Sequence, residues 1–274
     1  MKSLSVAACV LVACSSSPLE PSSGGGGTNG NSAGAGAVAE AGAVAEAGAV
    51  AEAGAVAEAG AVAEAGSGGG KFADRCSTAR AQLLGAIDTV SSGVVEVVSE
   101  ASGIETLYVD ATVGGQDGVT THPWTFISLD SASKAAVTDV TSVHSLAWDL
   151  AFKRAQIYTN GGEGGPGSGA SVFLDKDFAL VTSDDLSGAH FVTENFFDSD
   201  CNAVVEVTGA ASTSFSAWYD YDQQTHVLSP VPGTWLVRSA TGKFFKLRFD
   251  SYYATPSGGM GSASGAYLLE IGAL

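Results

Sequence analysis

From residue 94 onward, apolar and polar side chains alternate over short stretches that are rich in β-branched and aromatic residues. Such alternation is typical of strands with one buried face, and the glycine-rich clusters between the stretches are typical of turns. The pattern predicts strands over Val94–Ser99, Glu105–Val113, Trp124–Leu129, Ser145–Arg154, Gln156–Thr159, Val204–Val207, Phe215–Tyr221, His226–Leu228, Thr234–Ser239, Lys243–Tyr253 and Ala266–Ile271. Many short strands with such turns favour a mostly β fold, with antiparallel sheets in one compact domain.

The clearest local element is a hairpin formed by Thr234–Ser239 and Lys243–Phe249. Gly242, in the short connection, can adopt the positive φ that a tight hairpin turn requires. In the second arm phenylalanine and leucine alternate with lysine, arginine and aspartate, which predicts one buried and one solvated face.

One helix is expected before the strands. Over Lys71–Val90, apolar residues recur three or four positions apart, as on one face of a helix. They are Phe72, Cys76, Ala79, Leu83 and Ile87.

The first residues have a different pattern, a basic start followed by a short apolar run. Residues 1–13 read as an export signal peptide, because the run ends at a small residue and is far too short to span a bilayer. Leu11-Val12-Ala13-Cys14 has the form of a bacterial lipobox, which predicts lipidation of Cys14 and a location at the outer membrane or cell surface. The alternative is an ordinary cleaved signal with an incidental cysteine.

Residues 14–70 form a low-complexity acidic spacer. Its main part is a near-perfect Ala-Gly-Ala-Val-Ala-Glu repeat from Gly36 to Gly66. A six-residue period advances each glutamate by about 240° around a helix, so the repeat offers no apolar stripe. We expect a disordered or partly helical spacer, which leaves residues 71–274 as the single β domain.

The formal net charge of −17 argues against nucleic acid as a partner. Of the four cysteines, Cys9 lies in the signal peptide and Cys14 is assigned to lipid, which leaves Cys76 and Cys201 in an exported domain. Two thiols in an oxidising compartment are expected to form a disulfide, and two separate buried thiols are the alternative.

No arrangement of residues predicts catalysis. The chain has no Gly-x-Ser-x-Gly elbow and no zinc-like cluster of cysteine and histidine. The loop Asn160–Gly169 contains Gly-x-Gly-x-x-Gly, but a strand rather than a helix follows it, so no nucleotide site is expected. Asp198-x-Asp200-x-Asn202 begins like a calcium loop but lacks the later glycine and glutamate. We therefore expect neither an enzyme nor a metal site.

Two sequence blocks are distinctive. The first is Trp-Asp-Leu-Ala-Phe-Lys-Arg over Trp148–Arg154, which continues into the glycine-rich loop Asn160–Gly169. The second comprises Trp218–Tyr221, Thr225–Pro230, Trp235–Arg238, Thr241–Leu247 and Ser251–Tyr253. Together they resemble the HmuY-like family of bacterial lipoproteins. The resemblance implies a mostly antiparallel β fold and a role in binding haem at the cell surface for iron acquisition.

Haem needs an apolar surface and one or two axial donors. His226, beside the aromatic segment Trp218–Tyr221, is the first candidate ligand, and His190, beside Phe191, is the second. His122, His144 and Met260 are the other donors of suitable type.

The resemblance places a histidine ligand a few residues after Trp218, where this chain has Asp222-Gln223-Gln224. The sequence therefore supports two hypotheses. In the first, the domain binds haem or a related tetrapyrrole, with the membrane and a haem-carrying protein as partners. In the second, it is a surface scaffold or adhesion domain that kept the fold without the cofactor.

Three polar residues of the first block have structural interpretations. Lys153 is expected to be a solvated strand residue. Asp149 is expected to cap loop amides, and Arg154 to pair with Asp149 or to orient the loop backbone. Trp148, Leu150 and Phe152 share strand parity and are expected to face the core.

Overall fold

A computed structural model describes residues 75–274. The predicted signal peptide, the lipidation residue Cys14 and the acidic spacer lie outside the described residues, as do Lys71–Asp74. All described residues belong to one compact unit. Among them, no helix has the length and apolar character needed to cross a membrane.

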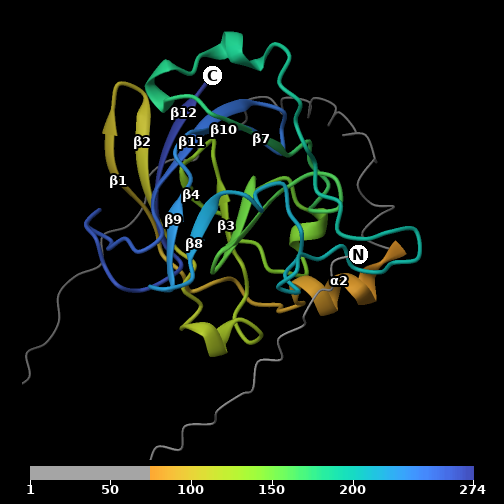
Figure 1. Ribbon diagram of the computed structural model, residues 1–274. Coiled ribbons are helices and arrows are strands. Elements are labelled where there is room, and N and C mark those ends of the chain that lie inside the picture. The colour runs from red at the N-terminus through yellow and green to blue at the C-terminus, as the bar shows by residue number, and fades with distance from the viewer. Residues whose placement is uncertain (1–74) are drawn as a thin grey trace, which may run out of the picture. The chain divides into compact units, whose positions relative to one another are not determined.

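The larger sheet has six strands in the order β1-β2-β12-β11-β10-β7, and every neighbouring pair is antiparallel. Its strands are β1 (Val95–Ala101), β2 (Ile104–Asp110), β7 (Ala170–Leu174), β10 (Thr234–Arg238), β11 (Phe244–Ser251) and β12 (Ala266–Ala273). Strand β12 lies between β2 and β11, so it joins the N-terminal hairpin β1–β2 to the rest of the sheet (Figure 1).

A second sheet has the order β4-β3-β5-β6, with strands β3 (Thr125–Ser128), β4 (Ser133–Lys134), β5 (Leu150–Lys153) and β6 (Gln156–Thr159). The hairpin of β8 (Tyr219–Asp222) and β9 (Val227–Pro230) forms a third, separate ladder. Four short 3₁₀ turns complete the elements: Gln116–Gly118, Ser142–His144, Phe178–Leu180 and Ser183–Leu186. The predicted mostly β, antiparallel fold is confirmed.

The second sheet is buried on both of its faces. Leu150 and Phe152 pack into the main hydrophobic cluster between the sheets, together with residues of β2, β11 and β12. Ala151 and Trp148 pack into a second cluster on the other side, with Leu84 of the helix. The prediction that Trp148 shares a face with Leu150 and Phe152 is therefore wrong, although all of them are buried.

The helix is shorter than predicted. Helix α2 spans Ser77–Leu84 and ends at Gly85, whose φ of 92° stops it. The carbonyl of Leu84 accepts a hydrogen bond of 2.6 Å from the indole N–H of Trp124. The end of the helix is thus fixed by tertiary structure, which the apolar spacing over Lys71–Val90 does not reveal.

The hairpin of β10 and β11 is confirmed, with Gly242 at φ 90° in its turn. One strand prediction fails, because Val204–Val207 forms only an isolated bridge between Val205 and Ala211. The sequence interpretation also missed two strands, β4 and β7. Strand β7 follows the glycine-rich loop and pairs with β10 at the sheet edge.

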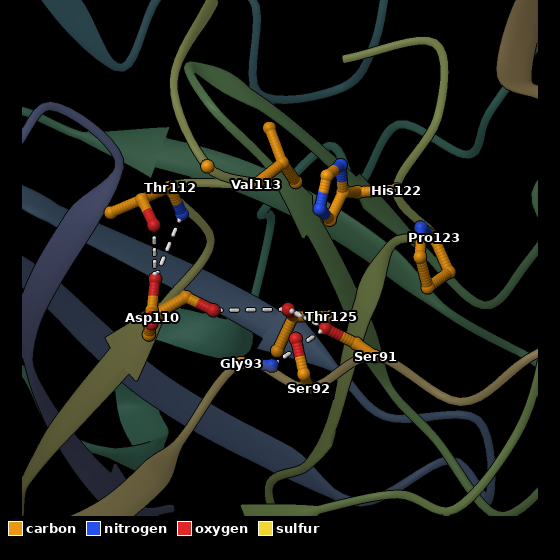
Figure 2. A pocket seen from close by; sticks show the side chains of 10 residues that line it. Ser91, Ser92, Gly93, Asp110, Thr112, Val113, His122, Pro123 and Thr125 are labelled. Atoms are coloured by element: carbon orange, nitrogen blue, oxygen red, sulfur yellow. Dashed lines mark hydrogen bonds between the residues drawn. The ribbon is translucent and has the colours of Figure 1, made fainter. Parts of the chain in front are cut away.

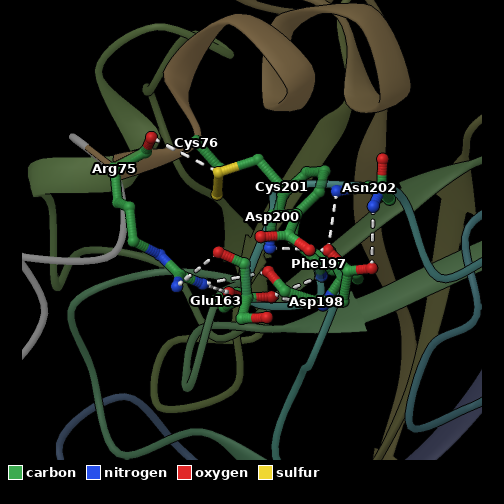
Figure 3. The surroundings of a disulfide bond; sticks show 10 residues. Arg75, Cys76, Glu163, Phe197, Asp198, Asp200, Cys201 and Asn202 are labelled. Carbon is green, nitrogen blue, oxygen red and sulfur yellow. Dashed lines mark hydrogen bonds and ion pairs between the residues drawn. A yellow bond between two sulfur atoms is a disulfide. The ribbon is translucent and has the colours of Figure 1, made fainter.

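The predicted disulfide between Cys76 and Cys201 is present, with Cα atoms 5.4 Å apart. It joins the start of α2 to the loop that begins at Asp198 (Figure 3). The carboxylate of Asp198 accepts backbone hydrogen bonds from Asp200 and Asn202, so the calcium-like sequence serves as a turn. The described residues contain no group of acidic, histidine or cysteine side chains that could hold a metal ion.

Candidate ligand-binding site

His226 lies at the end of the turn that joins β8 to β9. The side chain of Asp222 accepts backbone hydrogen bonds from Gln224 and Thr225, and its carbonyl accepts one of 2.8 Å from the His226 backbone N–H. The hydrogen bonds from Gln224 and Thr225 to its carboxylate hold the pKa of Asp222 below its usual range. His226 has a φ of 58°, a left-handed conformation that the turn imposes on a residue other than glycine.

The imidazole of His226 contacts one side chain across the hairpin. Its Nδ1 lies 2.6 Å from the phenolic oxygen of Tyr221, and both side chains are exposed. When Nδ1–H donates to the phenol, the lone pair of Nε2 points away from the contact and is free to bind a metal. A metal-binding histidine is usually oriented by such a hydrogen bond on its other nitrogen.

The β8–β9 hairpin packs against buried or half-buried aromatic side chains. The phenol of Tyr253 accepts a hydrogen bond of 3.0 Å from the Leu228 backbone N–H, which fixes β9 against the segment that follows β11. Just before β8, the buried Trp218 donates its indole N–H to the carbonyl of Ala155 at 2.8 Å. Burial in the same aromatic cluster raises the pKa of Tyr252 to about 12. Hydrogen bonds and aromatic packing therefore fix the β8–β9 hairpin that carries the exposed His226.

Apolar side chains on this part of the surface are exposed. Tyr221 and Val227 on the hairpin are 49% and 41% exposed. Met260, which pairs through its backbone with Ala254 next to Tyr253, is 77% exposed. The thioether of Met260 accepts a hydrogen bond from the hydroxyl of Ser251. This surface offers an imidazole, a thioether and apolar contacts on the segments that meet at Tyr253.

His190 is also exposed but lies elsewhere. Its neighbour Phe191 packs on Phe244 at the start of β11, with ring centroids 5.5 Å apart. The hairpin that carries His226 is instead fixed to Tyr253, beyond the end of β11. The nine residue steps from Phe244 to Tyr253 span roughly 30 Å at 3.3 Å per residue. His190 and His226 are therefore at opposite ends of the sheet and cannot ligate one iron together.

The remaining histidines have other surroundings. His122 lines a polar cavity of about 190 Å³ with serine and threonine residues and Asp110 (Figure 2). Its Nδ1 lies 3.1 Å from the carbonyl of Gly118, within its own turn. His144 closes the 3₁₀ turn Ser142–His144 and is exposed. The cavity at His122 is hydroxyl-lined and lacks the apolar surface that a tetrapyrrole needs.

The glycine-rich loop Asn160–Gly169 is held by close backbone packing and by the side chain of Asn160. A Cβ on Gly161 would lie 1.9 Å from the carbonyl oxygen of Gly169, so the chain passes too close to itself for any side chain. Asn160 crosses the loop, donating to the carbonyls of Ser145 and Trp148 and accepting from the Gly167 N–H. Strand β7 follows the loop, and no helix that could bind a phosphate is present there.

The polar residues of the first sequence block have distinct environments. Asp149 caps the backbone amides of Leu129 and Ala240, which confirms its predicted role. Arg154 donates to the carbonyl of Ser264 and does not pair with Asp149. The prediction for Lys153 is wrong, because its side chain is buried and the residue is only 4% exposed.

Sequence reasoning missed two features of these sites. It did not identify Tyr221 as the partner of His226, although the two residues flank a short turn. It also missed the buried amine of Lys153, for which a signal existed. Lys153 has the same strand parity as Ala151, which lies on the face that packs against α2.

Comparison with known proteins identifies a family for this chain. A family model described as HmuY protein matches residues 120–267, which is more than half of the chain and includes both distinctive blocks. No curated protein matches the chain.

Three crystal structures are similar. A “putative lipoprotein” from Bacteroides fragilis has 20% identity and a TM-score of 0.41, and the match covers 65% of this chain and 93% of that one. A “putative HmuY_like heme binding protein” from Bacteroides vulgatus has 17% identity and a TM-score of 0.40, with coverages of 65% and 96%. The apo HmuY analog of Tannerella forsythia has 13% identity and a TM-score of 0.42, with coverages of 67% and 97%. On the match over residues 120–267, the chain belongs to the HmuY protein family.

Proposed function

We propose that this protein is a lipid-anchored surface module that binds haem or a related tetrapyrrole, with His226 as an axial ligand. The observation that carries the proposal is the hydrogen bond between His226 and Tyr221, which leaves Nε2 free while fixing the ring. Membership of a family of binding proteins supports the same conclusion and argues against an enzyme.

The residues present at the hairpin fit such a group. Haem supplies the iron and a large apolar ring, and the protein supplies the axial donor and apolar contacts. His226 would bind the iron, and Tyr221 orients its imidazole. Val227 offers apolar surface for the ring. Met260, exposed on a segment next to Tyr253, would be a second donor of suitable type, since imidazole–thioether pairs are an established form of haem ligation.

Attachment to the membrane rests on Cys14. Lipidation there would tether the spacer, and the spacer would hold the domain away from the bilayer, within reach of a haem-carrying protein. Several acyl chains are needed for stable anchoring, since one chain binds only marginally. The similar protein from Bacteroides fragilis is also described as a “putative lipoprotein”, which supports an exported, surface location.

Haem titration of the full chain tests the proposal. We expect a shifted Soret band in the wild type and a weaker, altered spectrum in His226→Ala. His190→Ala is the matched control and should behave like the wild type. Tyr221→Phe should retain binding but change the spectrum, because the phenol orients the ring. Absence of any Soret shift at tens of micromolar, with folding confirmed by circular dichroism, would refute haem binding.

The second hypothesis is a surface scaffold without cofactor. The observation that favours it is the sequence Asp222-Gln223-Gln224, which forms a self-capped turn and provides no histidine. Affinity capture from an envelope extract, with the domain prepared without haem as bait, tests this hypothesis, which expects a specific protein partner to be recovered. A pigmented protein purified from its native source would contradict it.

A further inference from the structure

Lys153 is a buried amine with few protein partners. It ends strand β5, and its Nζ donates a hydrogen bond of 3.3 Å to the carbonyl of Val119. The ammonium also lies 5.2 Å from the ring centroid of Trp124. An ammonium has three N–H donors, and the described residues provide Lys153 with no second hydrogen bond and no ion pair. A buried charge of this kind ordinarily requires a partner.

The nearest acidic group is committed to other contacts. The two oxygens of Asp139 accept the backbone N–H groups of Trp124 at 2.9 Å and of Ile87 at 3.3 Å. A methyl group on Gly85 would lie 3.3 Å from Asp139 Oδ2 and 3.6 Å from Lys153 Nζ, so both charged groups border the space beside this glycine. They form no ion pair with each other. Burial lowers the pKa of the Lys153 amine, and the negative charge of Asp139 opposes this shift from a distance without binding the amine.

A cavity of about 220 Å³ opens onto Lys153. Its walls come from the end of α2, the segment Val119–Thr120 and the ring of Trp124. Leu83 and Leu84 make one side apolar, and Gln82 and Gln156 add polar groups. The volume is below the roughly 300–1,000 Å³ of drug-sized ligand sites, so the cavity suits a small molecule.

We propose that this cavity binds a small monocarboxylate with a short apolar tail. The carboxylate pairs with the Lys153 ammonium and uses its two free donors, while the tail packs on Leu84 and Trp124. A single cation with Asp139 nearby disfavours a dianion such as phosphate. The site is separate from the histidine hairpin, because none of its lining residues belongs to β8 or β9.

Calorimetric titration of the full chain with hexanoate tests the carboxylate. Hexanamide is the neutral probe of the same shape, and we expect it to bind at least tenfold more weakly at pH 7. Lys153→Met should remove this preference, whereas Lys243→Met, the same change at an exposed lysine, should keep it. Equal binding of hexanoate and hexanamide to the wild type, or no binding of either at millimolar concentration, overturns the proposal.

A second pair of variants covers the case in which Lys153→Met does not fold. Ala81 is exposed on α2 and lines the cavity, so Ala81→Trp should fill it and weaken hexanoate binding at least tenfold. Thr78 is exposed on the same helix but does not line the cavity, so Thr78→Trp should have no effect. Retained binding in Ala81→Trp places hexanoate elsewhere and rejects this site. His226→Ala should leave hexanoate binding intact, which separates this result from the haem experiment.

Discussion

The carboxylate of Asp149 accepts a hydrogen bond of 2.7 Å from the backbone N–H of Ala240, which lies 91 residues later in the chain. Its other oxygen accepts one of 2.7 Å from the N–H of Leu129. Asp149 precedes β5 of the smaller sheet, and Ala240 lies in the turn between β10 and β11 of the larger one. One buried side chain thus joins the two sheets.

Asp149→Asn should destabilise the fold. An amide can accept one of the two hydrogen bonds, but its NH₂ group faces the other N–H, so one buried donor loses its partner. We expect the free energy of unfolding to fall by about 2–3 kcal/mol. Urea denaturation measures the change. Asp175→Asn, at an exposed aspartate, is the control and should leave the midpoint unchanged; equal midpoints for the two variants would contradict the role of Asp149.

Glu194 should make stability depend on pH. Burial raises the pKa of its carboxyl, although Thr159 and Ser214 donate hydrogen bonds to it. Because the folded-state pKa lies above that of the unfolded chain, the folded state holds the proton more tightly. The stabilisation is complete below the unfolded pKa and is lost as pH rises through the folded pKa.

The measurement is the free energy of unfolding from pH 4 to pH 8. We expect the free energy of unfolding of the wild type to fall as pH rises, because Glu194 ionises. In Glu194→Gln, which cannot ionise, the free energy of unfolding should change less steeply with pH. Asp139 and Asp149 also have raised pKa values through burial, so part of the slope should remain in the variant. Identical slopes would show that Glu194 does not titrate in this range.

The sequence predicts those elements that depend only on the pattern of residues within them. Strand β6 occupies Gln156–Thr159 as expected, and the β10–β11 hairpin follows from alternation and one glycine. The end of α2 depends on the tertiary contact with Trp124, which no local pattern contains. Strand parity places Lys153 on the same face as Ala151, but the burial of that face follows only from the packing of α2 against it. The disulfide was predictable because two cysteines remained for an exported domain.

For the candidate site, the sequence identified His226 from its aromatic surroundings but not its contact with Tyr221. Both residues flank the turn, yet the 2.6 Å contact depends on the left-handed conformation of His226. That conformation follows from the Asp222 cap, a detail of the turn that a strand prediction over His226–Leu228 does not contain.

Removal of the disulfide should cost a large part of the stability. The bond closes a loop across 125 residues, and the chain-entropy model assigns about 4–5 kcal/mol to a loop of that length. We expect the double variant Cys76→Ser, Cys201→Ser to unfold at lower urea concentration and to be cleaved within α2 by limited proteolysis. Reduction of the wild type should reproduce both effects, and an unchanged midpoint after complete reduction would contradict them.

Trp218 and Trp235 are both buried in the main cluster but differ in the hydrogen bonding of their indole N–H groups. Comparing them distinguishes the contribution of hydrogen bonding to stability from that of packing. The indole N–H of Trp235 has no partner among the described residues, whereas that of Trp218 donates to Ala155. Both rings lie in the main cluster, so Trp→Phe removes similar apolar volume at each position. At Trp218 the substitution also leaves a carbonyl without its donor, and at Trp235 it removes an unsatisfied donor. We therefore expect Trp235→Phe to be more stable than Trp218→Phe by about 1–3 kcal/mol in urea denaturation. Equal losses would mean that the Trp235 N–H finds a partner in solution, since packing alone cannot distinguish the two sites.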